Sequence, residues 1–545
     1  MKRTGGELLA EQLIAQEVKT VFGVPGIQLD YAVDGFAQHR DDIDFISARH
    51  EQGAAYMADG YARVSDRPGV AIVVPGPGLL NAGAALSTAF ATNSRMVCIT
   101  GQIPSPTIGR GLGMLHEITD QSGVLKSLTK WSGIARTPEE IPDLVQEAFR
   151  QVGSGRPRPV GIEIPPDVLK ATTSATAVAP AEIEPTVPDA GEISRSAALL
   201  RGAEEPVIFV GGAVRDAAAS RALAALAEKL GAPVVMSRNG KGALSDRHPL
   251  ALSRLAGVPA MEAADVILVV GSRFITIEGK PFVQAGDRKL IALNADVADT
   301  GAPRAYDERI IADARLGLEA LTAELGEFSR AARDLEPLRA VEQEKLRLIA
   351  PQIEWLQAIR RALPDDGVLV EELTQVGYAA RLAYPVYEAG TYITPGYQGT
   401  LGYGFPTGLG ARVGKPSSPV VSINGDGGFG WSLQELSTAA KYGIGLVTVV
   451  FNNGSFGNVE RIQQDTFGRT IGVDLHNPDL RTLAKAYGVE AERVTTPAGL
   501  GAAIRNAAAA NQPILLEVPM TDVPDPWKLL AERSIPGERP AKSAH

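Results

Sequence analysis

The chain has 545 residues, of which 45% are hydrophobic and 21% charged, and its net charge is −10. This length is typical of about three or four domains. An acidic chain without a basic run argues against nucleic acid or an anionic membrane as a partner. The single cysteine, Cys98, excludes an intrachain disulfide and a thiolate metal cage. Because no stretch approaches the ~20 apolar residues of a membrane span, we expect a cytoplasmic protein.

Short apolar runs alternate with helical patterns along most of the chain. Strand-like runs occur at 45–48, 69–74 and 96–100, and the alternation restarts after an Ala/Thr/Pro-rich segment at 172–188. We therefore predict an α/β protein with three doubly wound parallel-sheet domains. The predicted boundaries are an N-terminal domain at 1–171, a linker at 172–190, a central domain at 191–330, a linker at 331–350, and a C-terminal domain with its tail at 351–545.

A helical segment rich in small residues, 49–63, carries Glu51 in its first turn. His50-Glu51 does not begin a zinc-binding helix, because the second histidine of that motif is replaced by Ala54. The simplest interpretation of Glu51 is a carboxylate favoured by the helix dipole. The strand at 69–74 runs into a Pro-Gly-Pro-Gly turn that is followed by Asn81.

The last third contains a strand–helix–strand unit. Val420 to Ile423 and Leu446 to Phe451 are the expected strands, and a helical pattern ended by Gly443 connects them. A right-handed crossover would place Asp426 and Asn453 at the carboxyl ends of neighbouring parallel strands, where open α/β sheets bind ligands.

Oxygen ligands at this position suit a magnesium ion. Asp426, Asn453 and the carbonyl of Ser455 are the predicted ligands. Gly427 and Gly428 would let backbone N–H groups approach a diphosphate. An ordinary turn with a capping aspartate explains either half alone, but the two halves at this spacing favour a metal–diphosphate site.

Three motifs in this order, RHEQGAAYMADGYAR, VPGPGLLN and GDG…NN, resemble the thiamine-diphosphate enzymes. The resemblance covers nearly the whole chain and is strongest to the acetolactate-synthase-like branch of the acetolactate synthase, pyruvate oxidase and benzoylformate decarboxylase superfamily. It implies a pyrimidine-binding N-terminal domain and a diphosphate-binding C-terminal domain. It also implies thiamine diphosphate and Mg²⁺ as cofactors, and a homodimer or homotetramer with active sites at the subunit interface.

The resemblance further implies a carboligase or lyase that acts on a 2-oxo acid through an ylid and an enamine. Glu51 matches the catalytic glutamate that hydrogen-bonds the pyrimidine ring, and the cofactor supplies the hard chemistry. A 2-oxo acid decarboxylase and a 2-hydroxyacyl-CoA lyase on the same cofactor are alternatives. A cofactor-binding homologue without turnover is an alternative of a different class.

Contacts with the cofactor follow from the same resemblance. Leu401 stands where relatives usually have a methionine that props the cofactor into a bent shape. Any large aliphatic side chain can fill this role. The expected cofactor-binding residues are Gly26, Gly76, Asn81, Thr374, Gln375, Gly399, Leu401, Asp426, Gly427, Gly428, Asn453 and Phe456.

The chain departs from the family pattern where the substrate is expected. His116 stands where relatives have the glutamine of a Phe-Gln-Glu motif, and an imidazole there could move protons because the unperturbed pKa of the histidine side chain is near ~6.5. A hydrogen-bonded histidine on a loop surface is the alternative. Ile27, Asn458 and Glu460 are further candidates for substrate contact. No tryptophan lies between 456 and 470, which argues against a standard biosynthetic acetolactate synthase.

The central domain of acetolactate synthases and oxidases carries FAD. Arg238 to Gly242 and Gly271 to Phe274 resemble parts of that region, but 251–258 is short and lacks the usual Gly-Met-His-Gly stretch. The alternatives for this domain are FAD, bound ADP or coenzyme A, and no ligand.

Overall fold

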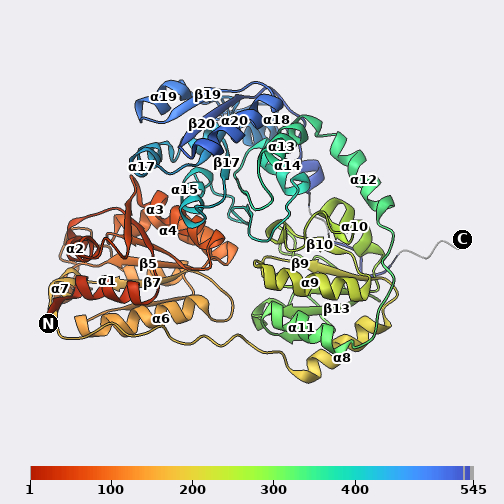
Figure 1. The fold of residues 1–545 in the computed structure, drawn as a ribbon, viewed down its shortest axis with the longest axis horizontal. Coiled ribbons are helices and arrows are strands. Elements are labelled where there is room, and N and C mark those ends of the chain that lie inside the picture. Colours follow the sequence, from red (N-terminus) through yellow and green to blue (C-terminus); the bar gives the residue numbers. More distant parts are fainter. Residues whose placement is uncertain (1, 532–533, 540–545) are drawn as a thin grey trace, which may run out of the picture. The chain divides into compact units, whose positions relative to one another are not determined.

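The computed structural model describes residues 2–531 and 534–539 and contains three six-stranded parallel sheets flanked by helices (Figure 1). This confirms the predicted fold class. The chain divides into two compact units, of which the first contains 1–184, 369–373 and 395–520 and the second contains 185–368, 374–394 and 521–545. In the described part of the chain, no helix has both the length and the apolar character needed to cross a membrane.

The N-terminal sheet has the strand order β3-β2-β4-β5-β7-β6. Its inner strands β4 and β5 are buried at every position, because helices cover both faces of the sheet. Its elements are α1 (Gly5–Ala15), β2 (Thr20–Gly23), α2 (Asp30–Gln38), β3 (Asp44–Ser47), α3 (Glu51–Val64), β4 (Gly69–Val73), α4 (Pro77–Thr92), β5 (Met96–Gly101), α5 (Gln121–Leu128), β6 (Trp131–Ile134), α6 (Ile141–Gly153), β7 (Val160–Ile164) and α7 (Pro166–Lys170). A small antiparallel pair, β1 (Arg3–Thr4) and β8 (Thr172–Thr173), joins the two ends of the domain.

The C-terminal sheet has the order β16-β15-β17-β18-β20-β19. Adjacent β17 and β18 run parallel with Gly425 opposite Phe451, so their carboxyl ends are neighbours, as predicted. Its elements are β15 (Val368–Glu371), α14 (Gln375–Ala383), β16 (Tyr392–Ile393), α15 (Gly404–Gly414), β17 (Val420–Gly425), α16 (Asp426–Phe429), α17 (Leu436–Tyr442), β18 (Val447–Asn452), α18 (Gly457–Phe467), α19 (Leu480–Ala486), β19 (Glu490–Arg493), α20 (Pro497–Ala510), β20 (Ile514–Pro519) and α21 (Trp527–Leu530).

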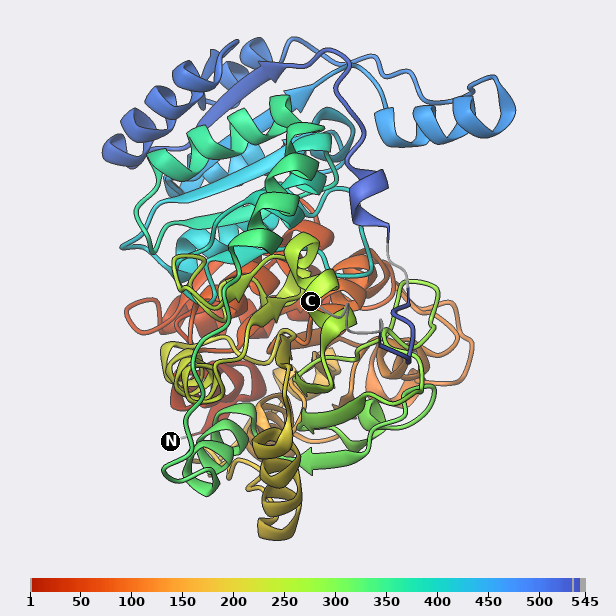
Figure 2. The same ribbon diagram turned by 90° about the vertical axis from the view of Figure 1, so that its right-hand side faces the viewer.

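The single helix expected between β17 and β18 is instead broken into short pieces. After α16 comes a 3₁₀ turn at Leu433–Glu435, and then α17, which ends at Gly443 in the left-handed conformation. Three glycines at 427, 428 and 430 weaken the helix at its start. Helix α18 follows β18 and projects from its domain without a buried residue (Figure 2).

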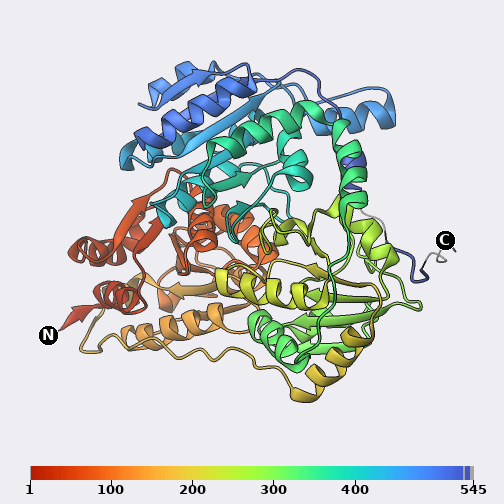
Figure 3. The same cartoon turned by 45° about the vertical axis from the view of Figure 1, so that its right-hand side comes forward.

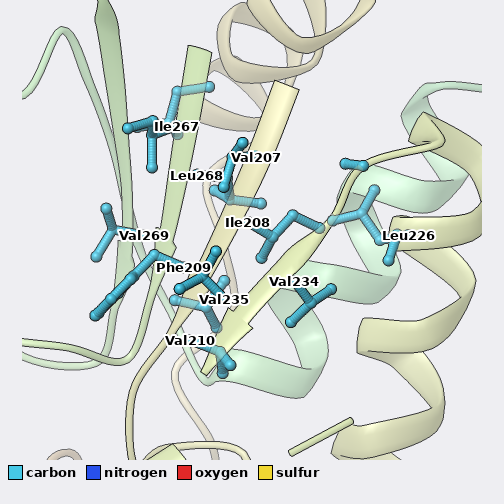
Figure 4. Packing of buried hydrophobic residues seen from close by; sticks show 14 of the residues in the cluster. Val207, Ile208, Phe209, Val210, Leu226, Val234, Val235, Ile267, Leu268 and Val269 are labelled. Atoms are coloured by element: carbon cyan, nitrogen blue, oxygen red, sulfur yellow. The ribbon is translucent and has the colours of Figure 1, made fainter. Parts of the chain in front are cut away.

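The central sheet has the order β11-β10-β9-β12-β13-β14. Its core includes Val207, Phe209, Leu226 and Leu268, which interdigitate between the strands and α9 (Figure 4). Helices α9 and α11 lie side by side along the sheet (Figure 3). The elements are α8 (Ala190–Gly202), β9 (Pro206–Val210), α9 (Ala217–Leu230), β10 (Val234–Met236), β11 (Ala251–Leu252), α10 (Arg254–Ala263), β12 (Val266–Val270), β13 (Lys289–Asn294), β14 (Glu308–Ile311), α11 (Ala314–Glu324), α12 (Glu336–Arg347) and α13 (Ala350–Ala362).

The C-terminal tail packs within the second unit. Trp527 lies against Tyr378, with ring centroids 5.0 Å apart, and the Arg288 guanidinium donates to the carbonyl of Pro536. The expectation that the tail lies near the active site or an interface stays a prediction.

Helices α3 and α15 approach each other closely through glycines. A Cβ atom on Gly410 would stand 1.8 Å from the carbonyl oxygen of Met57, and one on Gly60 would stand 2.0 Å from that of Thr407. The small residues noted in 49–63 therefore serve this contact, which joins the helix that begins at Glu51 to the C-terminal sheet.

We expect Gly410→Ala to destabilise the protein by about 1–3 kcal/mol or more, because the added methyl must displace backbone rather than a flexible side chain. Urea unfolding measures the loss. Gly83→Ala is the matched control in α4, since its Cβ would meet only Leu128 Cδ1, at 3.7 Å. The control should be neutral or slightly stabilising, and equal effects of the two substitutions would contradict the close helix contact.

Candidate active site

Glu51 is the first residue of α3 and is half-buried. The Asn81 amide on α4 donates a hydrogen bond of 3.0 Å to Glu51 Oε2. Gly78 lies beside the carboxyl group, where a Cβ would stand 3.5 Å from Glu51 Oε1. The structure thus brings together two residues that the sequence placed in separate motifs, and it leaves the carboxyl group accessible.

The Gly76 turn meets the His116 loop. Gly76 has a φ of +56°, and a Cβ there would lie 2.2 Å from the His116 carbonyl oxygen, so only glycine fits. His116 itself has a φ of 67°, and its Nδ1 atom is buried without a hydrogen-bond partner in the described part of the chain. His116 and the cofactor loop predicted from the sequence are therefore neighbours.

A buried polar network holds this turn in place. Gln121 Oε1 accepts from the Gly76 N–H at 2.8 Å, and Gln121 Nε2 donates to Glu163 Oε2 at 2.9 Å. Gln102 donates to the same carboxylate oxygen at 2.7 Å. The sequence did not single out Gln121 or Glu163, because their distance along the chain gives no local signal.

Two oxygen atoms converge with a side-chain amide at the ends of β17 and β18. The Asn453 amide nitrogen donates to Asp426 Oδ1 at 3.2 Å and to the Ser455 carbonyl oxygen at 3.1 Å. Rotation of this amide would turn its oxygen toward the other two oxygen atoms, an arrangement that a cation between them would stabilise. The three predicted ligands are therefore together, and the described residues contain no metal-binding group of three or more His, Cys, Asp or Glu side chains.

Asp426 is buried, and burial raises its pKa although hydrogen bonds from Asn477 and Gly454 oppose the shift. Its Oδ2 atom accepts from Asn477 Nδ2 at 2.6 Å and from the Gly454 N–H at 2.9 Å. These bonds orient Asp426 so that Oδ1 faces Asn453. Sequence reasoning missed Asn477, which lies in a loop with no motif.

The glycines after Asp426 have close neighbours. A Cβ on Gly427 would stand 2.6 Å from the Phe456 ring, and one on Gly428 would stand 2.3 Å from Glu372 Oε1. Phe456 is the residue that precedes α18. The backbone at Gly427 and Gly428 therefore lies between a ring and a carboxyl group.

Glu372 lies fully buried after β15 and was not among the predicted site residues. Its Oε1 atom accepts from the Gly402 N–H at 2.7 Å, in the turn that carries Gly399 and Leu401. Burial raises the pKa of Glu372 to about 8, although the N–H groups of Gly402, Tyr403 and Gly404 lower it. Glu372 thereby connects the turn that carries Leu401 to the glycines after Asp426.

We expect Glu372→Gln to remove a pH-dependent loss of stability. Between the ordinary pKa of 4.5 and about 8, the unfolded chain ionises this group while the folded protein keeps it protonated. The wild type should therefore lose up to roughly a few kcal/mol relative to the variant as the pH rises through this window, with no further divergence above it. Urea unfolding at several pH values measures this difference, and a difference independent of pH would contradict the protonated state.

The remaining predicted residues have the following places. Gly26 packs against Val74, where a Cβ would stand 2.4 Å from its side chain, and Ile27 is 68% exposed. Thr374 and Gln375 lie at the start of α14. The Asn458 side chain accepts a hydrogen bond from Arg461, and the Glu460 carboxylate accepts one from the Ser455 hydroxyl.

The candidate site thus has two parts, Glu51 beside the Gly76 turn and the cluster of Asp426, Asn453 and Ser455 beside Gly427, and the class of enzyme follows from comparison with known families. The chain matches three family models: the N-terminal TPP binding domain of thiamine pyrophosphate enzymes at 3–124, their central domain at 193–321, and their C-terminal TPP binding domain at 374–518.

Relatives extend the match over nearly the full length. A probable 2-ketoarginine decarboxylase of Pseudomonas aeruginosa is 35% identical, over 89% of this chain and 88% of its own. A probable acetolactate synthase large subunit of Methanocaldococcus jannaschii is 33% identical, over 94% and 91%. The acetolactate synthase isozyme 3 large subunit of Escherichia coli is 31% identical, over 91% and 90%. The chain belongs to the thiamine pyrophosphate enzymes and is a thiamine-diphosphate-dependent, acetolactate-synthase-like enzyme of the transferase or lyase type.

Proposed function

We propose that the protein is a thiamine-diphosphate- and Mg²⁺-dependent carboligase or lyase that acts on a 2-oxo acid. The observation that carries this proposal is the convergence of Asp426 Oδ1, the Asn453 side-chain amide and the Ser455 carbonyl oxygen at the ends of two adjacent strands, where rotation of the amide would present three oxygen atoms to a cation. A hard cation with phosphate oxygens and water in its remaining positions suits this oxygen set.

The glycines beside the oxygen cluster support binding of the diphosphate. Gly427 and Gly428 have no side chain that would cover their N–H groups, and they follow Asp426 in the short helix α16. When bound, thiamine diphosphate supplies a nucleophilic carbon and an electron sink for the carbonyl chemistry. The turn at Gly399 and Leu401 is proposed to hold the cofactor in its bent shape.

Glu51 is the proposed proton carrier at the pyrimidine ring. Asn81 fixes the orientation of one carboxyl oxygen, which leaves the other to bind a ring nitrogen. His116 is proposed to exchange a proton with the substrate, since its buried Nδ1 atom has no hydrogen-bond partner among the residues that the structure describes. Ile27, Asn458 and Glu460 are proposed to contact the substrate.

Simple decarboxylation is the second candidate outcome. The relative from Pseudomonas aeruginosa is named a probable 2-ketoarginine decarboxylase, and 456–470 contain no tryptophan. Both observations favour release of an aldehyde over addition to a second 2-oxo acid.

A homodimer or homotetramer is the proposed assembly. In this proposal Glu51 of one subunit serves the cofactor held by Asp426 and Asn453 of another. Exposed apolar side chains in the first unit, including Leu80 at 52%, Trp431 at 57% and Ile471 at 84%, offer surface for such contacts.

The proposed function is tested by incubating the protein with thiamine diphosphate, Mg²⁺ and a panel of 2-oxo acids and aldehydes, followed by product analysis. Acetolactate from pyruvate alone supports the synthase reaction, whereas free aldehyde alone supports the decarboxylase. The panel should include a guanidino 2-oxo acid because of the decarboxylase relative. Absence of every cofactor-dependent reaction would refute the proposal, and the colour of the purified protein tests for FAD.

A further inference from the structure

Glu435 is a buried carboxyl group whose partners lie in the segment that leads to Glu51. Its Oε1 atom accepts from the backbone N–H groups of Arg49 and His50, both at 3.1 Å. Its Oε2 atom accepts from the Arg49 N–H at 3.2 Å and from the Thr438 hydroxyl at 2.6 Å. The two residues immediately before Glu51 are thus held by a side chain from the C-terminal domain.

The sequence of α3 accommodates this carboxyl group. A Cβ atom on Gly53 would stand 2.4 Å from Glu435 Oε1, so the group reaches the backbone only because residue 53 has no side chain. Glu435 is fully buried, and burial raises its pKa although the Thr438, Arg49 and His50 donors oppose that shift. Burial of an acceptor without partners is costly, which makes these backbone bonds strongly favoured.

We propose that Glu435 is a positioning residue that fixes the start of α3 and thereby aims the Glu51 carboxyl group. The N–H groups of Arg49 and His50 lie ahead of the first helical turn, so their anchoring fixes the backbone from which the Glu51 side chain projects. Glu435 lies in the 3₁₀ turn between α16 and α17, so the segment that begins with Asp426 also supports the start of the helix that carries Glu51 in the same chain. This inference rests on the proposed role of Glu51.

Two substitutions distinguish the effect of the hydrogen-bond acceptor at residue 435 from the effect of side-chain size. Glu435→Leu keeps a similar size but removes both acceptors, whereas the amide oxygen of Glu435→Gln can still accept from Arg49 and His50. Tyr442→Phe is the matched control: it removes a hydroxyl that accepts from the Ser47 N–H at 2.8 Å, another link to the same segment. Should Glu435→Leu fail to fold, Gly53→Ala displaces the same carboxylate.

Backbone hydrogen exchange of the cofactor-free full chain measures whether the segment at Arg49 and His50 stays hydrogen-bonded. In Glu435→Leu we expect the amides of Arg49 and His50 to lose protection. With thiamine diphosphate and Mg²⁺ added, deuterium exchange at the thiazolium carbon and kcat should both fall by about 10²-fold, because a small misplacement of a catalytic group is costly. KM should change much less, and Glu435→Gln should restore most of both rates.

Wild-type protection and wild-type thiazolium exchange in a folded Glu435→Leu protein would overturn the inference. An equal loss in Glu435→Gln or in Tyr442→Phe would also overturn it, because the effect would then not depend on the acceptor at residue 435. If the Arg49 and His50 amides lose protection in Glu435→Leu but the wild type shows no cofactor chemistry, the proposed function is refuted and the structural contact is supported. The backbone measurement therefore separates the two failures.

Discussion

Replacing Glu51 by glutamine is expected to lower deuterium exchange at the thiazolium carbon, and kcat with it, by about 10²- to 10⁴-fold. Glutamine can still accept the Asn81 hydrogen bond seen at 3.0 Å, so the local geometry survives. It cannot share a proton with a ring nitrogen, which is the part of the proposed role that the substitution removes. Cofactor affinity should change little, because the proposed metal–diphosphate contacts lie elsewhere.

Nuclear magnetic resonance of the acid-quenched cofactor measures the exchange, and calorimetry measures its binding. Glu7→Gln is the matched control, since Glu7 also lies in the first turn of a helix and forms a capping box. Wild-type exchange in Glu51→Gln would contradict the catalytic assignment. Low exchange in both the wild type and the variant would favour the non-catalytic alternative.

Replacing Asp426 by asparagine should weaken binding of Mg²⁺ and thiamine diphosphate by at least about 10- to 100-fold. The substitution removes the only ionised ligand of the proposed cluster, while Asn477 and Gly454 can still donate to the remaining amide oxygen. The cofactor-free variant should unfold no earlier than the wild type, because the change removes a buried charge.

Thermal unfolding with and without saturating cofactor measures this effect, since a ligand stabilises the folded state according to its affinity. The wild type should gain stability from Mg²⁺ with thiamine diphosphate, and Asp426→Asn should lose that gain at the same concentrations. Asp465→Asn, exposed on α18 of the same domain, should keep it. An unchanged gain in Asp426→Asn would place the metal elsewhere.

The sequence by itself determined the fold class and predicted the two parts of the candidate site. Strand–helix alternation produces parallel sheets wherever helices cover both faces, and this regularity is local. Asp426 and Asn453 were predicted together for the same reason, because a right-handed crossover brings the ends of β17 and β18 side by side. Glu51 and Asn81 were found through family motifs rather than through spacing.

Only the tertiary structure decided what supports these residues. Glu435 is far along the chain from Arg49 and His50, and Asn477 is 51 residues from Asp426, so no periodic pattern links them. Their roles depend on buried hydrogen bonds between elements, which a sequence encodes only through the complete fold. The sequence analysis missed the break between α16 and α17 because the apolar periodicity of a helix continues through this segment. In the structure, the glycines of α16 and the 3₁₀ turn that ends at the buried Glu435 interrupt the helix.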